Sequence, residues 1–409
     1  MAEARKILVI GCGPAGVWAA ISAKKQNPFA DVTLLSNEHC EPYEKPPLSK
    51  GVLTGKSRAE DAPIAGPKGL TGHGVTFMPH SHVVSIERAV KMVALEDGRQ
   101  LPYDALVIAT GSVVRQLPMF PAAMPNVFYL RTEKDSAALR AALGNAKTLV
   151  IIGAGLIGLE VAASARELGK DVIVLEVAPR ILARVTDTEI GARVHEAHVK
   201  QGVDIRLNTT ITAARNDSDG RVAIDTNHGT IHADAVLVGA GAVPDVTLAK
   251  AASLDVEIGI VVDEYGQTSD PAIFAAGDVT RFPGPDGHAR LEDWRHAQDH
   301  GAVAGRNAAG ANDSYNPVPS FWSEQYDLYI QGIGWPPAQQ NGYIHRPMPG
   351  NASLAFRVSG NYISYALGIN VQRDVATARR LIERKIAVDP ANLTDPAKPL
   401  ADLLKVARS

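Results

Sequence analysis

The chain has 409 residues, of which 45% are hydrophobic, 21% charged and 5% aromatic. This length predicts two or three domains, and the composition excludes a disordered, collagen-like or disulfide-stapled protein. The formal net charge of −3 argues against a nucleic-acid partner, and no run approaches the ~20 apolar residues of a membrane span, so we expect a cytoplasmic protein.

The N-terminal segment has the pattern of a dinucleotide-binding βαβ unit. Its predicted order is strand, glycine turn, helix and strand, over residues 6–10, 11–16, 17–26 and 31–35. In the turn, Gly11 permits the tight bend, Gly13 lets the backbone approach a pyrophosphate, and Gly16 lets helix and strand pack closely. The helix N-terminus then offers free N–H groups to the phosphates.

The same order recurs later in the chain, over residues 148–152, 153–158, 159–168 and 171–175. The two glycine turns lie 142 residues apart, which indicates a duplicated nucleotide-binding fold rather than a short repeat. Glu176 ends the last strand of this copy, where a carboxylate accepts both ribose hydroxyls and repels a 2′-phosphate. Because Val177 and Ala178 supply no cation, we predict NADH rather than NADPH.

The first copy lacks this strand-end acid. Aligning the strands of the two copies places Ser36 where the second copy has Glu176. Either Asn37 or Glu38 must then reach the ribose, or no residue does, and we favour Asn37. Two dinucleotide sites in one chain predict electron transfer between two dinucleotides.

The rest of the chain completes these units and adds a third. Three more apolar strands end in glycine turns, over residues 103–111, 234–241 and 273–278. Residues 54–74, rich in Gly, Pro and Lys, predict an exposed loop or short helical excursion, and a basic helix is expected over 375–385. We predict a discontinuous first domain, a second domain and a C-terminal α+β domain, over residues 1–112 with 246–316, 113–245 and 317–409.

Several motifs together resemble the pyridine nucleotide-disulfide oxidoreductase-like flavoproteins. They are the two glycine turns, Ala-Thr-Gly at 109–111, and the run ending in Ala-Ala-Gly-Asp at 268–278. Three further stretches, at residues 42–50, 129–132 and 321–325, are similar to one branch of that superfamily. This branch is the FAD-dependent NADH:ferredoxin reductases of the putidaredoxin reductase type, which serve cytochromes P-450 and Rieske aromatic oxygenases. The resemblance implies an α/β, glutathione-reductase-like fold with FAD-binding, NADH-binding and C-terminal domains.

The resemblance also implies an FAD site. Lys50 is expected beside the flavin N5 edge, Asp278 at the ribityl chain and Trp294 against the flavin. The residues assigned to FAD are Gly11, Gly13, Pro14, Ala15, Gly16, Asn37, Lys50, Val83, Ala109, Thr110, Gly111, Arg131, Gly277, Asp278, Trp294 and Trp322. The family usually has Asp where this chain has Asn37, and more often Asn where it has Asp245.

A second set of residues is implied for NADH. Its members are Gly153, Gly155, Leu156, Ile157, Gly158, Glu160, Glu176, Arg184 and Gly241. Glu160 is expected to pair with Lys50, and the two are the predicted catalytic residues. A buried Lys–Glu pair costs desolvation, which favours a functional reason for it.

The implied reaction is hydride transfer from NADH to FAD, followed by single-electron transfer to an acidic [2Fe–2S] ferredoxin. From residue 371 onward there are eight basic and five acidic side chains, so we expect docking through Arg379, Arg380 and Arg384. Thiol chemistry is not expected, because Cys12 lies in the phosphate turn and Cys40 has no CxxC or cationic context. No metal site is expected, and we expect either a monomer or a homodimer.

Two other classes of function stay open at this stage. One is an NADH-responsive flavoprotein sensor, in which turnover is incidental. The other is an NADH oxidase, or a rubredoxin or monodehydroascorbate-type reductase, on the same fold. Fast NADH reduction with fast output to an iron–sulfur protein separates the ferredoxin reductase from the sensor.

Overall fold

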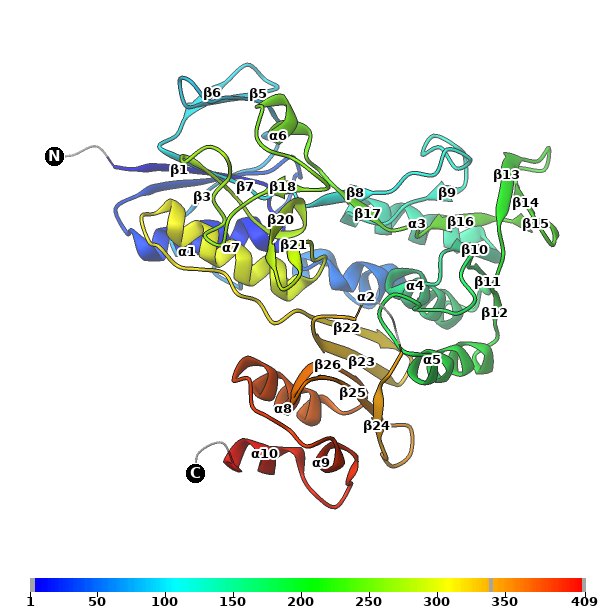
Figure 1. Ribbon diagram of the computed structural model, residues 1–409. Coiled ribbons are helices and arrows are strands. Elements are labelled where there is room, and N and C mark those ends of the chain that lie inside the picture. The colour runs from blue at the N-terminus through cyan, green and yellow to red at the C-terminus, as the bar shows by residue number, and fades with distance from the viewer. Residues whose placement is uncertain (1–3, 338–340, 407–409) are drawn as a thin grey trace. The chain divides into compact units, whose positions relative to one another are not determined.

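The computed structural model describes residues 4–337 and 341–406 (Figure 1). The chain divides into two compact units. Unit 1 contains Met1–Lys45, Arg58–Val113 and Ala242–Pro317, and unit 2 contains Pro46–Ser57, Val114–Gly241 and Val318–Ser409. Residues 46–57 therefore group with unit 2, and the predicted three-domain boundaries stay a prediction. Arg408, part of the basic C-terminal segment, lies outside the described residues.

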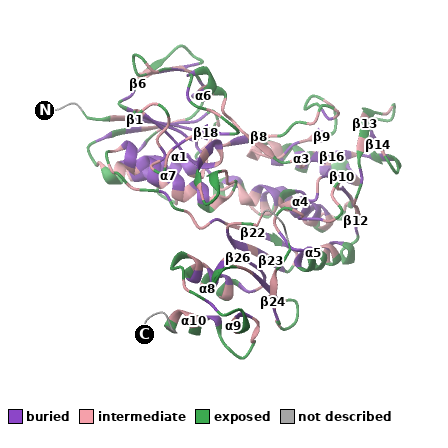
Figure 2. Ribbon diagram, in the orientation of Figure 1, coloured by how far each residue is buried: buried purple, intermediate pink, exposed green. Residues whose placement is uncertain are grey.

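Unit 1 is built on a five-stranded parallel sheet of order β19-β7-β1-β2-β3. Its strands are β1 (Lys6–Ile10), β2 (Asp31–Leu35), β3 (Thr76–Met78), β7 (Ala105–Ile108) and β19 (Ile273–Ala275). Apolar residues of β1 and β7 are buried on both faces, as a parallel sheet requires (Figure 2). The predicted strands at 6–10 and 31–35 are therefore confirmed.

Two long helices pack side by side in unit 1, α1 (Pro14–Gln26) and α7 (Trp294–Ala308) (Figure 1). Their backbones come unusually close. A Cβ at Gly301 would lie 2.1 Å from the Ala15 carbonyl oxygen, and one at Gly305 would lie 2.0 Å from that of Ala19. These two glycines therefore let α7 lie against the N-terminal half of α1.

Shorter elements complete unit 1. The chain leaves unit 1 in β8 (Ser112–Val114) and re-enters it in β17 (Ala242–Pro244). Two small sheets have the orders β4-β5-β6 and β18-β20-β21. The other elements are η2 (Ala59–Asp61), η3 (Thr71–His73), β4 (Val83–Glu87), β5 (Met92–Leu95), β6 (Gln100–Pro102), α6 (Thr247–Ala251), β18 (Ile260–Val261), η4 (Gly277–Val279), β20 (Thr280–Gly284) and β21 (Gly287–Ala289).

Unit 2 repeats the same parallel arrangement in the order β12-β11-β10-β16-β9. Its strands are β9 (Val127–Phe128), β10 (Thr148–Ile152), β11 (Asp171–Leu175), β12 (Val203–Arg206) and β16 (Ala235–Val238). A three-stranded sheet joins β13 (Ile211–Asn216), β14 (Val222–Thr226) and β15 (Gly229–Ala233). The helices are η1 (Pro46–Ser49), α2 (Gly51–Thr54), α3 (Glu133–Asn145), α4 (Leu156–Glu167) and α5 (Thr188–Lys200).

The C-terminal part of unit 2 is an antiparallel sheet of order β22-β23-β26-β25-β24. Its elements are β22 (Ser320–Gln325), β23 (Leu328–Gly334), β24 (Ile344–Arg346), β25 (Ser353–Ser359), β26 (Tyr362–Ile369), α8 (Gln372–Glu383), α9 (Pro390–Thr394) and α10 (Leu400–Val406). One core cluster contains Leu53, Leu159 and Ile330, so residues 46–57 and the C-terminal sheet share a hydrophobic core with the nucleotide-binding fold of unit 2. The predicted α/β class is confirmed.

The structure corrects two predictions about local elements. Both helices after the glycine turns begin three residues early, at Pro14 and Leu156, because glycine caps them and the helix starts inside the motif. The segment 54–74 does form short helical turns, but Ile64 and Leu70 are buried in the core of unit 1, so it is not wholly exposed. Among the residues described, no helix is long and apolar enough to cross a bilayer.

Candidate functional site

The first glycine turn is tightly packed at two of its three glycines. Gly11 has a φ of +105°, and a Cβ there would lie 2.2 Å from the Ala109 carbonyl oxygen. A Cβ at Gly16 would lie 1.8 Å from the Gly11 carbonyl oxygen. Packing and conformation therefore explain these two glycines without any ligand.

Gly13 and its counterpart Gly155 are different. Their φ values of −71° and −81° suit any residue, and among the described atoms none lies within 4 Å of a Cβ built at either position. Neither the fold nor the backbone conformation requires glycine there. Each is the N-cap of a helix whose first N–H groups face the same open space, which fits a dinucleotide pyrophosphate.

The second glycine turn has its predicted partners close by in unit 2. A Cβ at Gly153, whose φ is +101°, would lie 2.6 Å from the Gly239 carbonyl oxygen. The Glu176 carboxylate accepts hydrogen bonds from the backbone N–H of Ala154, at 2.7 Å, and of Ala178, at 2.8 Å. Arg184 lies beside Gly241, with a guanidinium nitrogen 3.9 Å from the place of a Cβ there. The structure thus brings the predicted NADH residues to one end of the sheet.

The strand registers of the two copies match. Ile10 pairs with Leu35 in unit 1 as Ile152 pairs with Leu175 in unit 2, so Ser36 does stand at the place of Glu176. The Ser36 hydroxyl accepts the N–H of Glu38 at 3.0 Å, just as the Glu176 carboxylate accepts the N–H two residues further along. Ser36 therefore makes the same backbone hydrogen bond as Glu176 does. The nearest carboxylate in this copy is that of Glu38, two residues further along the chain.

Glu38 is the acid that reaches the first glycine turn. Its carboxylate lies 3.9 Å from the Cys12 sulfur and accepts hydrogen bonds from Tyr43, at 2.6 Å, and Lys45, at 2.7 Å. Burial raises the pKa of Glu38, but Lys45 and the hydrogen bonds outweigh it and the pKa is lowered overall. Asn37 is exposed, and its ribose role stays a prediction. The sequence analysis favoured Asn37, whereas in the structure it is Glu38 that contacts the glycine turn.

Other residues assigned to FAD also lie in unit 1, and one of them, Gly277, packs against the helix of the first turn. A Cβ at Gly277, which has a φ of +80°, would lie 2.7 Å from the Ala15 Cβ. Asp278 follows it and accepts a hydrogen bond from Ser112 at 3.1 Å. The indole N–H of Trp294 donates to Glu44, whose pKa is raised by burial. Val83 is buried in β4.

Asp245, where the family more often has Asn, acts mainly through its backbone. Its carbonyl oxygen accepts the Thr110 hydroxyl at 2.8 Å, and its N–H donates to the Gly111 carbonyl at 3.0 Å. Its carboxylate caps the turn at the N–H of Thr247. Asp and Asn serve equally in these contacts, so the departure leaves the turn at residues 109–111 intact.

Unit 2 contains the predicted ion pair of Lys50 and Glu160. The ammonium lies 2.8 Å from the Glu160 carboxylate and also donates to the Pro46 carbonyl at 3.1 Å. Glu160 is 3% exposed, and its carboxylate also accepts the hydroxyls of Ser49, at 2.5 Å, and Ser323, at 2.6 Å. The buried carboxylate is thus surrounded by donors, as a buried ion pair requires.

The segment that carries Lys50 is fastened to unit 2 by side chains that sequence reasoning did not single out. Ser164 donates to the Ser49 carbonyl at 2.7 Å, and Ser136 donates to the Leu48 carbonyl at 2.8 Å. The sequence pattern that could have indicated them is a serine on an otherwise apolar helix face. Lys50, Arg131 and Trp322, all assigned to FAD, lie in unit 2, and their flavin roles stay predictions.

Both cysteines are free thiols. Cys12 is buried and lies 2.9 Å from the Ser36 hydroxyl, and burial raises the pKa of its thiol. A thiol with a raised pKa is a poor nucleophile at neutral pH. This environment agrees with the expectation that the turn cysteine does no thiol chemistry.

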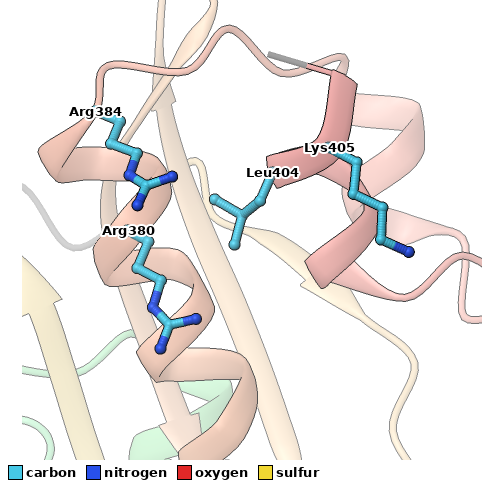
Figure 3. Close-up of a pocket in the computed structure, with 4 residues that line it drawn as sticks. All are labelled: Arg380, Arg384, Leu404 and Lys405. Carbon is cyan, nitrogen blue, oxygen red and sulfur yellow. The ribbon is translucent and has the colours of Figure 1, made fainter. Parts of the chain in front are cut away.

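The three arginines of the expected docking surface differ in their surroundings. Arg379 donates to the Ser320 hydroxyl at 2.9 Å and to Glu383 at 3.5 Å, so it is bound to its own unit. Arg380 of α8 and Arg384, the residue that caps the C-terminal end of this helix, are exposed and lie four residues apart, with Leu404 of α10 turned toward them (Figure 3). These two arginines are the more accessible part of the expected docking surface.

Known protein families and relatives match nearly the whole chain. A family model described as pyridine nucleotide-disulphide oxidoreductase matches residues 5–301, and one described as reductase C-terminal matches residues 320–404. The chain is 37% identical over 405 residues to the anthranilate 1,2-dioxygenase system ferredoxin–NAD(+) reductase component of Burkholderia cepacia, covering 98% of this chain and 100% of the relative.

Two further likenesses point to the same branch. Rhodocoxin reductase of Rhodococcus erythropolis is 36% identical, over 95% of this chain and 92% of its own length. A crystal structure of the covalent putidaredoxin reductase–putidaredoxin complex contains a chain that superposes with a TM-score of 0.93 at 32% identity, covering 100% of both chains.

Proposed function

Because this chain belongs to the pyridine nucleotide-disulphide oxidoreductase family, we propose that it passes electrons from NADH through FAD to a [2Fe–2S] ferredoxin that feeds a cytochrome P-450 or Rieske-type oxygenase. The family confirms the resemblance inferred from the motifs, and the chain is an oxidoreductase. The observation that carries the proposal is the pair of glycines, Gly13 and Gly155, that face open space in two otherwise tightly packed turns. The relatives named for ferredoxin reduction support the choice of partner.

FAD is assigned to unit 1. Gly13 and the first N–H groups of α1 would hold its pyrophosphate, Glu38 its adenosine ribose and Asp278 its ribityl chain. When bound, FAD supplies the capacity to take two electrons from NADH and to release them one at a time. The chain itself has to bind, orient and shield the cofactor. Lys50 and Glu160 keep their predicted role of presenting a positive charge to the reduced flavin.

NADH is assigned to the second turn. Gly155 would face its pyrophosphate, and Glu176, already held by two backbone N–H groups, would accept hydrogen bonds from the adenosine ribose. The 2′-phosphate of NADPH would be repelled by this carboxylate. The next residue, Val177, is 69% exposed and supplies no cation to bind it. The arrangement therefore supports a preference for NADH.

The ferredoxin would dock through basic side chains of the C-terminal sheet domain. Arg380 and Arg384 offer two exposed arginine side chains at the C-terminal end of α8. A transient redox contact of this kind is small and salt-sensitive, and its charges act mainly on the encounter rate.

A spectrum of the purified protein, followed by anaerobic titration with NADH and with NADPH, tests the assignment. We expect a flavin spectrum that NADH bleaches with one equivalent and that NADPH bleaches only at much higher concentration. A colourless protein that cannot be reconstituted with FAD would refute the proposal. A slow, oxygen-stable charge-transfer complex would instead favour an NADH-responsive sensor.

A further inference from the structure

A row of polar side chains runs through unit 2 from Glu160 to Tyr326. The Ser323 hydroxyl donates to Glu160 Oε1 at 2.6 Å, and Gln325 Nε2 donates to Ser323 at 3.0 Å. His198 Nε2 lies 2.8 Å from Gln325 Oε1, and the Tyr326 hydroxyl lies 3.3 Å from His198 Nδ1. The row joins α4 and α5 to β22 and to Tyr326, more than a hundred positions further along the chain.

The chemistry of each group fixes the direction of these hydrogen bonds. Gln325 uses its amide nitrogen on Ser323, so its carbonyl oxygen, which can only accept, faces His198. The Nε2 atom of His198 must therefore carry the proton. Burial lowers the pKa of His198, so its ring is neutral and Nδ1 accepts the hydrogen bond from Tyr326. In each of the four hydrogen bonds, the donor is then on the side away from Glu160 and the acceptor on the side toward it.

Such a row is costly unless it has a use. His198 and Ser323 are 0% exposed and Gln325 is 1% exposed. Burying polar groups costs desolvation that their mutual hydrogen bonds only offset, and an apolar interior of similar volume would be about as stable. The hydrogen bonds of the row end on the Glu160 carboxylate, which pairs with Lys50. Near its other end, Arg166 acts electrostatically on Tyr326.

We propose that His198 is a positioning residue that acts on the bound flavin through this row, by setting how strongly Glu160 neutralises Lys50. A carboxylate shares its charge over two oxygens. Lys50 lies on Oε2, while the row donates to Oε1 and draws charge toward it. The inference rests on the proposed function, because the action of Lys50 on FAD is part of it.

The holoenzyme variant His198→Leu tests the inference. Without the imidazole, Gln325 and Ser323 lose their fixed orientation, Glu160 neutralises Lys50 more fully, and reduced flavin is less stabilised. We expect the equilibrium constant for flavin reduction to fall about tenfold, ~30 mV for a two-electron couple. The matched control is Val194→Ala, fully buried one turn earlier on α5, which should lower stability but leave the potential unchanged.

Two more variants keep the test decisive if His198→Leu does not fold. Gln325→Met breaks the row at its centre and should shift the potential in the same direction. In a Lys50→Met background, neither change should shift it further, since the row acts through Lys50. Wild-type potentials in both row variants, or a shift that persists without Lys50, would overturn the inference. A wild-type protein that NADH does not reduce would instead refute the proposed function, and this inference with it.

Discussion

Gly13→Ala should lower the affinity of the chain for FAD without lowering its folding stability much. Because the φ of Gly13 is −71° and a Cβ there meets no described atom within 4 Å, alanine fits the folded chain without strain. Replacing an N-cap glycine by alanine costs less than about 1 kcal/mol. The same Cβ would stand where the FAD pyrophosphate approaches, so we expect FAD affinity to fall at least about 100-fold, ~2.7 kcal/mol.

The assay compares denaturant unfolding of the flavin-free chain with FAD binding followed by flavin fluorescence. Gly155→Ala is the matched variant, which should keep its FAD and its fold but lose NADH affinity. Gly16→Ala is the opposite control, since its Cβ would lie 1.8 Å from the Gly11 carbonyl oxygen and should destabilise the chain itself. If Gly13→Ala binds FAD with wild-type affinity, the open space at Gly13 has no cofactor role and the reasoning fails.

Three further predictions concern charges. Glu176→Ala should raise the KM for NADH about tenfold or more and narrow the preference over NADPH, as steady-state kinetics with both nucleotides will show. Reversing the charge of Arg380 and Arg384 together should raise the KM for an acidic ferredoxin about tenfold at low salt, and the difference from wild type should vanish at high salt. The pKa of Glu38 is lowered in the folded chain from its usual 4.5, so its stabilising contribution is present above pH 4.5 and lost as the pH falls below it. The unfolding free energy of the flavin-free chain should therefore depend less on pH in Glu38→Gln than in the wild type, and equal slopes would contradict this.

Four of the parallel strands, β1, β2, β10 and β11, could be predicted from the sequence to the residue. The short strands β3, β9 and β12 could not. Runs such as Lys6–Ile10 and Thr148–Ile152 are short, apolar and bounded by glycine, so their ends are local features. The helix starts at Pro14 and Leu156 are harder to predict, because a glycine motif has the composition of a turn. In the structure each helix begins within its motif, directly after the N-cap glycine.

What the sequence could not show depends on contacts between distant segments. Residues 46–57 group with unit 2 because Leu53 joins its core and Ser49 bonds to Glu160 and Ser164, 111 and 115 positions away. The reach of Glu38 to the glycine turn likewise depends on side-chain conformation, which strand periodicity does not encode. The hydrogen bond of His198 could not be predicted from the sequence, because its partner Gln325 lies 127 positions further along the chain.

The central claim is that electrons pass from NADH through a bound flavin to a one-electron acceptor. Rapid mixing of the FAD-loaded protein with NADH under anaerobic conditions, followed by an acidic [2Fe–2S] ferredoxin, measures both steps in one experiment. We expect fast bleaching of the flavin by NADH and then fast reduction of two ferredoxins per flavin. A flavin that NADH reduces fast but that leaves the added ferredoxin oxidised would contradict the assignment.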